Sequence, residues 1–320
     1  MRIGLFLLLG GFLLAGYGGG YTGAGFRYAS NAREMSLGGA LVAESNLAFQ
    51  HFSNPALLSE VKKSQFGLSY FEMSLDRSIQ VFSFTKPLPP KAAVGISFFR
   101  SATDEILGKN SLNEDTEILS VSEMYGMLSF GVSFSNRFSI GINFRAILNK
   151  FIEEYESKSI AMDFGIRLGI NDKIQMGIYG KNIFGFYQWK IDTNKNGITS
   201  DYVERFPQIW SIGCRYIISK NIKILMQNDM IIPPEQKLTT RFRLGAEYFY
   251  NQKAYVRVGI KQKYDVHYYK EPIKFNFSPS FGVGLPITRW SDNNVIINYS
   301  LDTGSENEGL SHLFTWVLEL

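Results

Sequence analysis

The segment FSIGINF, residues 138–144, alternates strictly between large apolar residues and small or polar residues. Successive side chains of an extended chain point to opposite faces, so the two kinds of residue separate onto the two faces of one strand. A strand of this kind suits a wall that meets lipid on one side and a lumen on the other. The same alternation recurs at 160–169, 241–248 and 275–285. The pattern therefore predicts an all-β protein.

Segments of this kind follow one another from Ser64 to the last residue. Their number, about fourteen, is even and lies within the range of bacterial outer-membrane barrels. We therefore predict a transmembrane outer-membrane β-barrel of about 14 antiparallel strands. The predicted strands lie near residues 64–73, 77–86, 91–101, 122–135, 138–149, 158–170, 173–181, 206–219, 222–231, 238–250, 254–263, 274–286, 293–301 and 311–320.

The connections between these segments are sorted by length. Every second one is a tight or proline-containing turn, namely 86–90, 136–137, 171–172, 219–221, 251–252 and 286–292. The others are longer, namely 102–121, 150–157, 182–205, 232–237, 264–273 and 302–310, except the first, near 75–76. Outer-membrane barrels place short turns on the periplasmic side and long loops outside, whereas a soluble sandwich has no reason to sort its loops.

The N-terminus has the pattern of a secretory signal peptide. Arg2 is followed by an apolar run over residues 3–14 and then by small residues. We assign residues 1–20 to this peptide. The alternative, an N-terminal anchor, needs a longer run, because a spanning helix takes about 20 apolar residues. An exported chain that crosses a membrane as a barrel is expected in the outer membrane of a Gram-negative type envelope.

The composition excludes several classes of protein. The net charge is +4 and no basic block is present, so we expect no nucleic-acid partner. Cys214 is the only cysteine, which rules out an intrachain disulfide. Aromatic residues make up 15% of the chain, an abundance that suits a barrel with aromatic girdles. We expect no cofactor.

Residues 26–61, FRYASNAREMSLGGALVAESNLAFQHFSNPALLSEV, do not alternate. They combine small residues with a polar patch, ESN at 44–46, and the tripeptide NPA at 54–56. Proline holds the residue before it extended and favours the first turn of a helix, so a short helix can begin at this tripeptide. We predict that residues 21–61 form a plug inside a barrel made by residues 62–320.

Glycines recur on the face of the strands that we assign to the lumen. Glycine weakens a strand, so a row of glycines needs a reason, and the close approach of another backbone is one. A plug packed against the wall would supply that backbone; the alternative is curvature and bulging of the wall itself. The glycines concerned are Gly131, Gly141, Gly165, Gly177, Gly213, Gly245, Gly259 and Gly282.

The same face carries charged residues. Isolated charges in a narrow lumen are costly, so we expect networks of arginine and carboxylate side chains. The more specific alternative is that these charged residues form a binding site for an anionic ligand. The lumen-facing residues are Arg145, Asp163, Arg167, Arg215, Arg243, Glu247 and Arg257.

One loop is similar to a calcium-binding loop. Asp192, Asn194 and Asn196 place oxygen atoms at alternate positions before Gly197. The twelfth position, where a bidentate Glu is wanted, is Val203. A polar turn explains the segment without a metal, and we expect no metal site.

Catalysis has little support in the sequence. His51 and the nearby Ser53 are the one local pair that a barrel hydrolase could use, and no complete set of Ser, His and acid is legible. The alternative is a packed or solvated plug histidine. We expect no enzyme.

Several short segments together resemble the PorV/PorQ family, within the FadL-like superfamily of outer-membrane transporters. They are REMSLGGA (33–40), NPALL (54–58), IAMDFG (160–165), GKNIFG (180–185), FP (206–207), SFGVG (280–284) and NYS (298–300). The plug residues that carry the resemblance are Arg33, Gly38, Gly39, Asn54, Pro55 and Ala56. Residues 44–46 depart from the acidic pair that relatives often show.

The resemblance implies a 14-stranded barrel with an N-terminal hatch and two candidate roles. PorV and PorQ serve the type IX secretion system and handle secreted protein cargo. FadL-like barrels pass hydrophobic small molecules such as long-chain fatty acids. We expect a role of the first kind, with the second as the alternative and a purely structural role as the third. In each case outer-membrane lipids are the surroundings of the barrel.

Overall fold

The computed structural model describes residues 22–74, 76–151, 155–191, 200–234, 238–262, 277–290, 293–303 and 310–320. Within these ranges the chain forms short helices followed by strands. The helices are η2 (Ala24–Arg27), α2 (Ala32–Ser36), α3 (Gln50–Ser53) and η3 (Pro55–Glu60). The strands are β1 (Gln65–Met73), β2 (Arg77–Leu88), β3 (Ala92–Lys109), β4 (Asp115–Ser135), β5 (Phe138–Phe151), β6 (Tyr155–Gly169), β7 (Ile174–Ile183), β8 (Phe186–Ile191), β9 (Ser200–Arg205), β10 (Gln208–Ser219), β11 (Ile222–Ile232), β12 (Thr239–Tyr250), β13 (Ala254–Gln262), β14 (Phe277–Trp290), β15 (Asn293–Asp302) and β16 (Ser311–Glu319).

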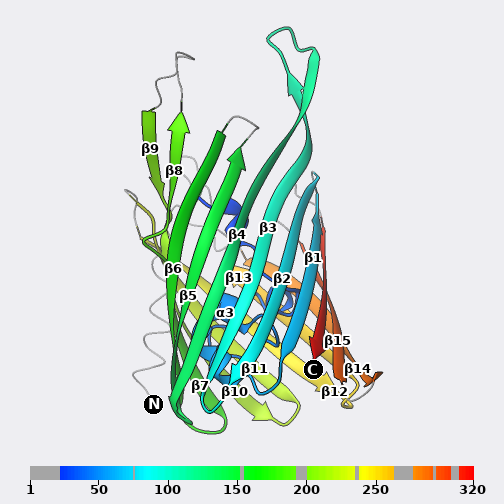
Figure 1. The fold of residues 1–320 in the computed structure, drawn as a ribbon. Helices are drawn as coiled ribbons and strands as arrows, with labels where there is room; N and C mark the ends of the chain where they lie inside the picture. The colour runs from blue at the N-terminus through cyan, green and yellow to red at the C-terminus, as the bar shows by residue number, and fades with distance from the viewer. Residues whose placement is uncertain are drawn as a thin grey trace.

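Fourteen of these strands, β1 to β7 and β10 to β16, close into one antiparallel ring (Figure 1). Neighbours in sequence are neighbours in the wall, and β7 pairs with β10. The ring is closed by β1 and β16, where Gln65 lies opposite Glu319. The prediction of a 14-stranded antiparallel barrel is confirmed. Each predicted segment corresponds to one wall strand, and most of the predicted ends lie within a few residues of the observed ones.

Two hairpins extend beyond the ring at its upper end in Figure 1. Strands β3 and β4 continue past the wall and pair as far as Lys109 and Asp115. Strands β8 and β9 pair with each other, and β8 pairs with the wall at Ser157 of β6, opposite Trp189. We expected loops at 102–121 and 182–205, and this prediction was wrong for the residues that form the two hairpins. Outside a bilayer a strand needs no apolar face, so its sequence lacks the alternation that marks the wall.

The outer face of the ring is apolar. Ile96 of β3, Leu128 of β4 and Phe144 of β5 lie side by side in register, and they are 54%, 55% and 48% exposed. Exposed rows of large apolar side chains are stable only against another apolar phase, and a closed barrel leaves no unpaired strand edge within a bilayer. Strands β1 to β7 and β10 to β16 thus form a transmembrane wall of the outer-membrane type.

Among the described residues, no helix is long and apolar enough to cross a membrane.

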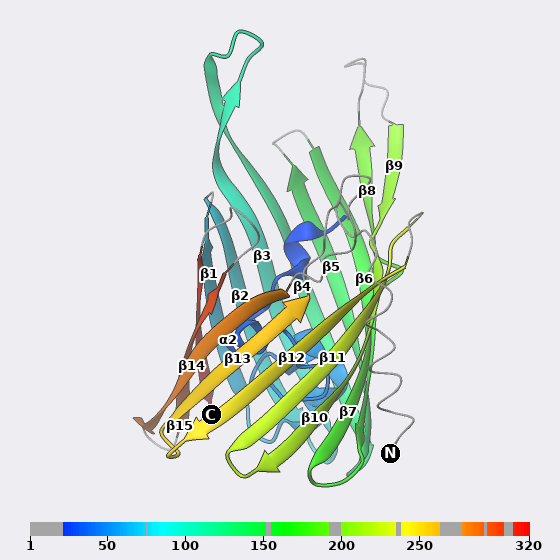
Figure 2. The ribbon, with the colours of Figure 1, turned by 180° about the vertical axis from the view of Figure 1, so that it is seen from behind.

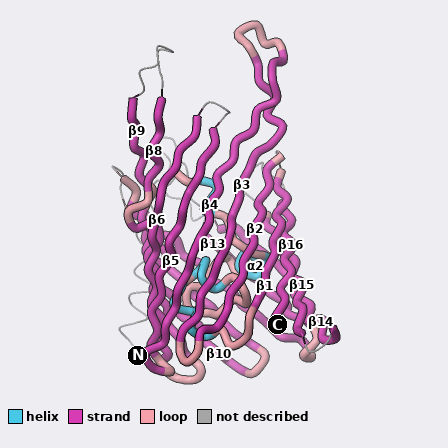
Figure 3. Tube along the Cα trace, in the orientation of Figure 1, coloured by secondary structure: helices cyan, strands magenta, loops and turns pink. Residues whose placement is uncertain are grey.

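Residues 22–61, called the plug from here on, lie inside the ring (Figures 2 and 3). The helices α2, α3 and η3 are enclosed by the strands on all sides in both views. Leu37, Leu41 and Leu57 of the plug are fully buried. The predicted signal peptide, residues 1–20, lies outside the described residues.

Leu128→Arg should destabilise the barrel, because it places a charge on the lipid-facing side of the wall. We expect the free energy of unfolding to fall by about 2–4 kcal/mol, the usual cost of arginine near the middle of a bilayer. Urea unfolding in lipid vesicles measures this change. Leu112→Arg, at the 76% exposed tip of the β3–β4 hairpin, is the control and should leave stability unchanged. Equal losses for both variants would contradict the assignment of the lipid-facing side.

Candidate functional site

The plug is seated against a belt of inward-facing glycines, called the glycine belt from here on. Many of them lie directly opposite one another across neighbouring strands, as Gly131 does with Gly141 and Gly245 with Gly259. A side chain at any of them would collide with plug residues between Ser36 and Ser59. The belt comprises Gly131, Gly141, Gly165, Gly177, Gly213, Gly245, Gly259 and Gly282. Close approach of the plug, and not curvature alone, therefore accounts for these glycines.

Asn54 ties the plug to itself and to the wall. Its side-chain amide donates to the backbone oxygen of Val42 at 2.8 Å and to that of Ile166 on β6 at 3.0 Å. Its Oδ1 accepts from the backbone N–H of Ala56 at 3.0 Å and so begins η3, with Pro55 at the first helical position. The side chain is fully buried. The predicted tripeptide NPA thus acts as a helix start that also joins two parts of the plug to a wall strand.

The pair Gly38 and Gly39 turns the chain after α2. Both have left-handed backbones, with φ of 63° and 77°. A side chain at Gly38 would meet the backbone oxygen of Ile260, and one at Gly39 would meet the guanidinium of Arg243. Glycine is required at both positions by the backbone conformation and by the neighbouring wall.

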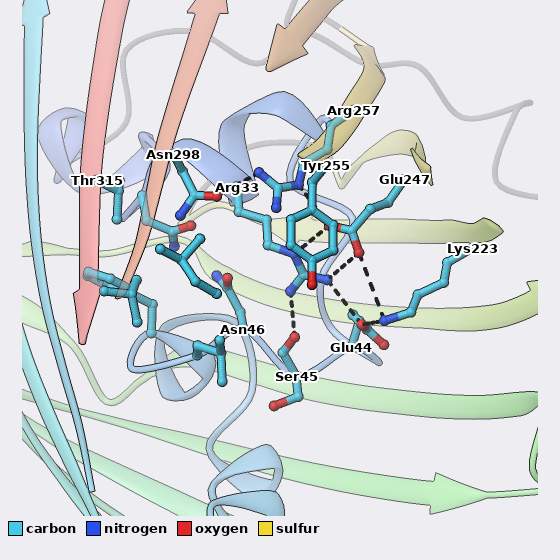
Figure 4. Close-up of a pocket in the computed structure, with 15 residues that line it drawn as sticks. Arg33, Glu44, Ser45, Asn46, Lys223, Glu247, Tyr255, Arg257, Asn298 and Thr315 are labelled. Carbon is cyan, nitrogen blue, oxygen red and sulfur yellow. Dashed lines mark hydrogen bonds and ion pairs between the residues drawn. The ribbon is translucent and has the colours of Figure 1, made fainter. Parts of the chain in front are cut away.

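Arg33, on α2, links the plug to the wall through two carboxylates (Figure 4). It donates to Glu247 of β12 at 2.8 and 3.0 Å and to Glu44 of the plug at 3.0 Å. Glu247 also accepts from Arg257 of β13 at 2.7 Å. Both acids are almost completely buried, so the cations that surround them are needed to keep them charged.

Glu44 joins this group from the polar patch of the plug. Lys223 of β11 donates to it at 2.7 Å, and Arg215 of β10 lies 3.4 Å from its other oxygen. Burial by itself would raise the pKa of Glu44, but Lys223 and Arg33 outweigh burial and hold this pKa below its usual value. Glu44 is therefore an anion that attracts three basic side chains.

The remaining predicted lumen residues also form ion pairs. Arg145 and Asp163 form a fully buried pair at 2.7 Å within the wall. Arg167 reaches Glu60 of the plug at 3.2 Å, and Arg243 reaches Asp229 of β11 at 2.6 Å. All seven predicted lumen residues thus face inward and are paired, which is the arrangement that the cost of burying single charges demands.

Several partners in these pairs were missed in the sequence. Asp229 and Lys223 lie on β11 at inward positions of the same parity, so the alternation contained the signal. Glu60 stands at the end of η3, where no strand pattern applies. Glu44 was noticed only as part of a polar patch. Which acid meets which base depends on how the plug sits, and local sequence carries no information on that.

The interior also contains an aromatic cluster, at the end of the barrel where the β3–β4 and β8–β9 hairpins stand. Phe26 of η2 packs edge-on against Tyr125 of β4, with ring centroids 5.0 Å apart. Phe99 of β3 and Phe206 lie 6.0 and 6.3 Å from Phe26. The other buried residues of the cluster are Ala32, Met35, Ala48, Phe49, Phe71, Met73, Ile79, Val81, Met127, Ile147, Ala161, Tyr187, Leu313 and Val317. The sequence-based description of a charged lumen did not anticipate this cluster, which lies next to charged groups: the guanidinium of Arg145 is 5.4 Å from the centroid of the Tyr125 ring.

His51 does not form the predicted pair with Ser53. Its Nε2 is hydrogen-bonded to the hydroxyl of Ser97 on β3 and lies 3.4 Å from that of Ser83 on β2. Burial lowers the pKa of His51 to about 3, so the ring is neutral near pH 7. In the part of the chain that the structure describes, no carboxylate contacts this ring. Its surroundings are those of a packed plug histidine.

The calcium-loop candidates Asp192, Asn194 and Asn196 lie outside the described residues. Within the described ranges, no cluster of three or more His, Cys, Asp or Glu side chains is arranged to hold a metal ion.

No protein-family model matches the sequence, and no curated protein matches it. Solved structures do match. The CymD monoaromatic hydrocarbon channel aligns with a TM-score of 0.63 at 12% identity, over 91% of this chain and 96% of that one. A FadL homologue from Pseudomonas aeruginosa gives 0.61 at 10% identity, over 91% and 98%. The toluene transporter TbuX from Ralstonia pickettii gives 0.60 at 12% identity, over 96% and 98%.

The barrel has the fold of the FadL-like outer-membrane channels. The likeness extends over nearly the full length of both chains in each comparison. Because the sequence identities are only 10–12%, the likeness shows a shared fold and nothing further.

Gly259→Val should disturb the seat of the plug, because its side chain would collide with the backbone of Gly38 and Leu37. Overpacking of this kind costs about 1–3 kcal/mol, and we expect a higher ion conductance across planar bilayers. Gly126→Val is the matched control, since no atom lies within 4 Å of a side chain placed there. If both variants conduct like the wild type, the glycine belt does not hold the plug closed.

The neutrality of His51 predicts a dependence of stability on pH. The folded-state pKa of about 3 lies below the ordinary value of 6.5, so protonation favours the unfolded chain. The wild type should therefore lose stability relative to His51→Gln as the pH falls from 6.5 towards 3, and the difference should be constant above that range. Urea unfolding at several pH values measures this, with His312→Gln as the control. Parallel curves for the wild type and His51→Gln would refute the assignment.

Proposed function

We propose that this protein is a non-enzymatic outer-membrane channel for hydrophobic small molecules. The observation that carries the proposal is the aromatic cluster inside the barrel. Phe99 and Tyr125 of the wall are buried and face the lumen, where the alternation of a barrel strand would be expected to place polar groups. Side chains of this kind contribute little to a water-filled pore and much to the binding of apolar molecules.

The packing of the plug residue Phe26 supports this proposal. The ring of Phe26 fits between wall aromatics in edge-to-face contacts, the geometry that aromatic rings prefer. An apolar ligand of similar size would make the same contacts with Phe99, Tyr125 and Phe206. On the side of the projecting hairpins, Phe26 thus takes the place that such a ligand would take among these rings.

The likeness to known channels supports the same function. CymD is a monoaromatic hydrocarbon channel and TbuX is a toluene transporter, and both share this barrel fold. Since the identities are only 12%, the substrate of this chain is inferred from its own aromatic cluster, with the neighbours in support.

A second candidate function, a PorV/PorQ-like role in protein secretion, rests on the hairpins beyond the rim. The β3–β4 hairpin exposes Leu107, Leu112 and Ile118, and the β8–β9 hairpin exposes Tyr202 and Val203. Exposed apolar side chains on a projecting arm suit contact with another protein, such as secreted cargo. The plug residues that resemble this family are explained by their packing, so the hairpins are the observation that favours this role.

Uptake by Gram-negative cells that express the protein tests the proposal. We expect faster uptake of radiolabelled toluene or oleate than in cells without it, and faster still for Phe26→Ala, because this variant removes the plug ring that packs against the wall aromatics. Phe98→Ala is the matched control, since Phe98 is adjacent to Phe99 but faces outward. The proposal would be overturned if uptake equals that of cells lacking the protein and a secreted protein is co-isolated through the hairpins. That result would favour secretion.

A further inference from the structure

A chamber of about 240 Å³ lies between the plug and the wall. It is bounded by plug residues 44–47 and by wall strands β11, β12, β13, β15 and β16. Lys223 and Tyr255 line the chamber, and each is the second residue of its strand, next to the tight turn that precedes β11 or β13. The chamber is therefore at the end of the barrel that carries the short turns, and Figure 4 shows its lining.

The ionisable side chains that line this chamber do not balance. Three are cations, Arg33, Lys223 and Arg257, and two are carboxylates, Glu44 and Glu247, so the lining has a net charge of +1. Each carboxylate already accepts from at least two cations. A single added anion would neutralise the lining, whereas an added cation would increase its charge.

The chamber also holds a hydrogen-bond donor that is not used. Asn46 is 3% exposed, and its Nδ2 has no hydrogen-bond partner among the described residues. Buried donors of this kind are rare in folded proteins, because leaving one unpaired costs about 1–3 kcal/mol. Two further donors line the same chamber: the hydroxyl of Tyr255 points into it (Figure 4), and the side chain of Lys223, which donates to Glu44, is still 33% accessible.

The rest of the lining is half apolar. Leu47 and Phe49 of the plug, Ile296 of β15 and Val317 of β16 supply the apolar part, beside the polar residues Asn31, Ser45, Asn298 and Thr315. A cavity of about 150 Å³ with apolar walls is large enough for benzene. The chamber therefore has room for one substituted aromatic ring beside a charged group.

We propose that this chamber binds an aromatic carboxylate, with the carboxylate at the donors Asn46, Tyr255 and Lys223 and the ring among the apolar residues. The charge of +1, the unpaired amide and the volume each point to this class of ligand. The apolar wall of the site adjoins the aromatic cluster through Phe49 and Val317, but the donors Asn46, Tyr255 and Lys223 lie outside that cluster. The site goes beyond the proposed function, because it can be occupied whether or not a molecule crosses the barrel.

Equilibrium binding to the purified full-length protein in detergent tests the site, with benzoate as the probe. We expect benzoate to bind at least tenfold more tightly than benzyl alcohol, which lacks the charge, and than acetate, which lacks the ring. Asn46→Asp keeps the shape but replaces the donor by a negative charge, and Lys223→Gln removes a cation. Each should weaken benzoate binding about tenfold or more, the effect expected for a hydrogen bond to a charged group.

Lys220→Gln is the matched control, since Lys220 is an exposed lysine on the turn next to β11, and it should bind benzoate like the wild type. Heat-modifiable gel migration shows that each variant is folded. The proposal is overturned if benzoate does not bind, if benzyl alcohol or acetate binds equally well, or if both folded chamber variants retain wild-type affinity. Any of these results leaves the uptake of toluene and oleate unaffected, so the two proposals fail separately.

Discussion

The close approach of the plug backbone to the wall is the constraint on which the rest of the structure depends. Leu37, Gly38 and Pro55 lie so near the strands that opposing positions such as Gly141 and Gly259 can carry no side chain. Glycine lowers the stability of a strand, so this belt is a local weakness of the wall that its packing against the plug offsets. The plug and the wall therefore stabilise each other.

Such close packing excludes bulk water and makes the burial of charge costly. The barrel meets this cost by pairing charges across the boundary between plug and wall, as Arg33 does with Glu247 and Arg167 with Glu60. Removing one partner of such a pair would leave a buried charge unpaired, which costs more than the pair contributes. These pairs therefore define the position of the plug more than they raise the stability of the barrel.

The plug also divides the interior into two environments. On the side of the projecting hairpins, Phe26 packs against Tyr125 in the aromatic cluster. On the side of the short turns, Glu44 and Asn46 face a chamber with an excess of positive charge. A single barrel can in this way present two kinds of binding site along one axis.

The sequence by itself determined the number of wall strands, the face each residue occupies and the inward position of glycines such as Gly141. These follow from alternation, which is a local property of the chain, because a lipid-facing strand must repeat every two residues. Only the tertiary structure decided that Arg33 meets Glu247, that the side-chain Nδ2 of Asn46 has no partner among the described residues, and that β8 and β9 pair beyond the rim. Some of those contacts join residues that are far apart in the sequence, so local sequence does not predict them. The others lie outside the bilayer, where a strand needs no lipid-facing apolar side and the alternation is lost.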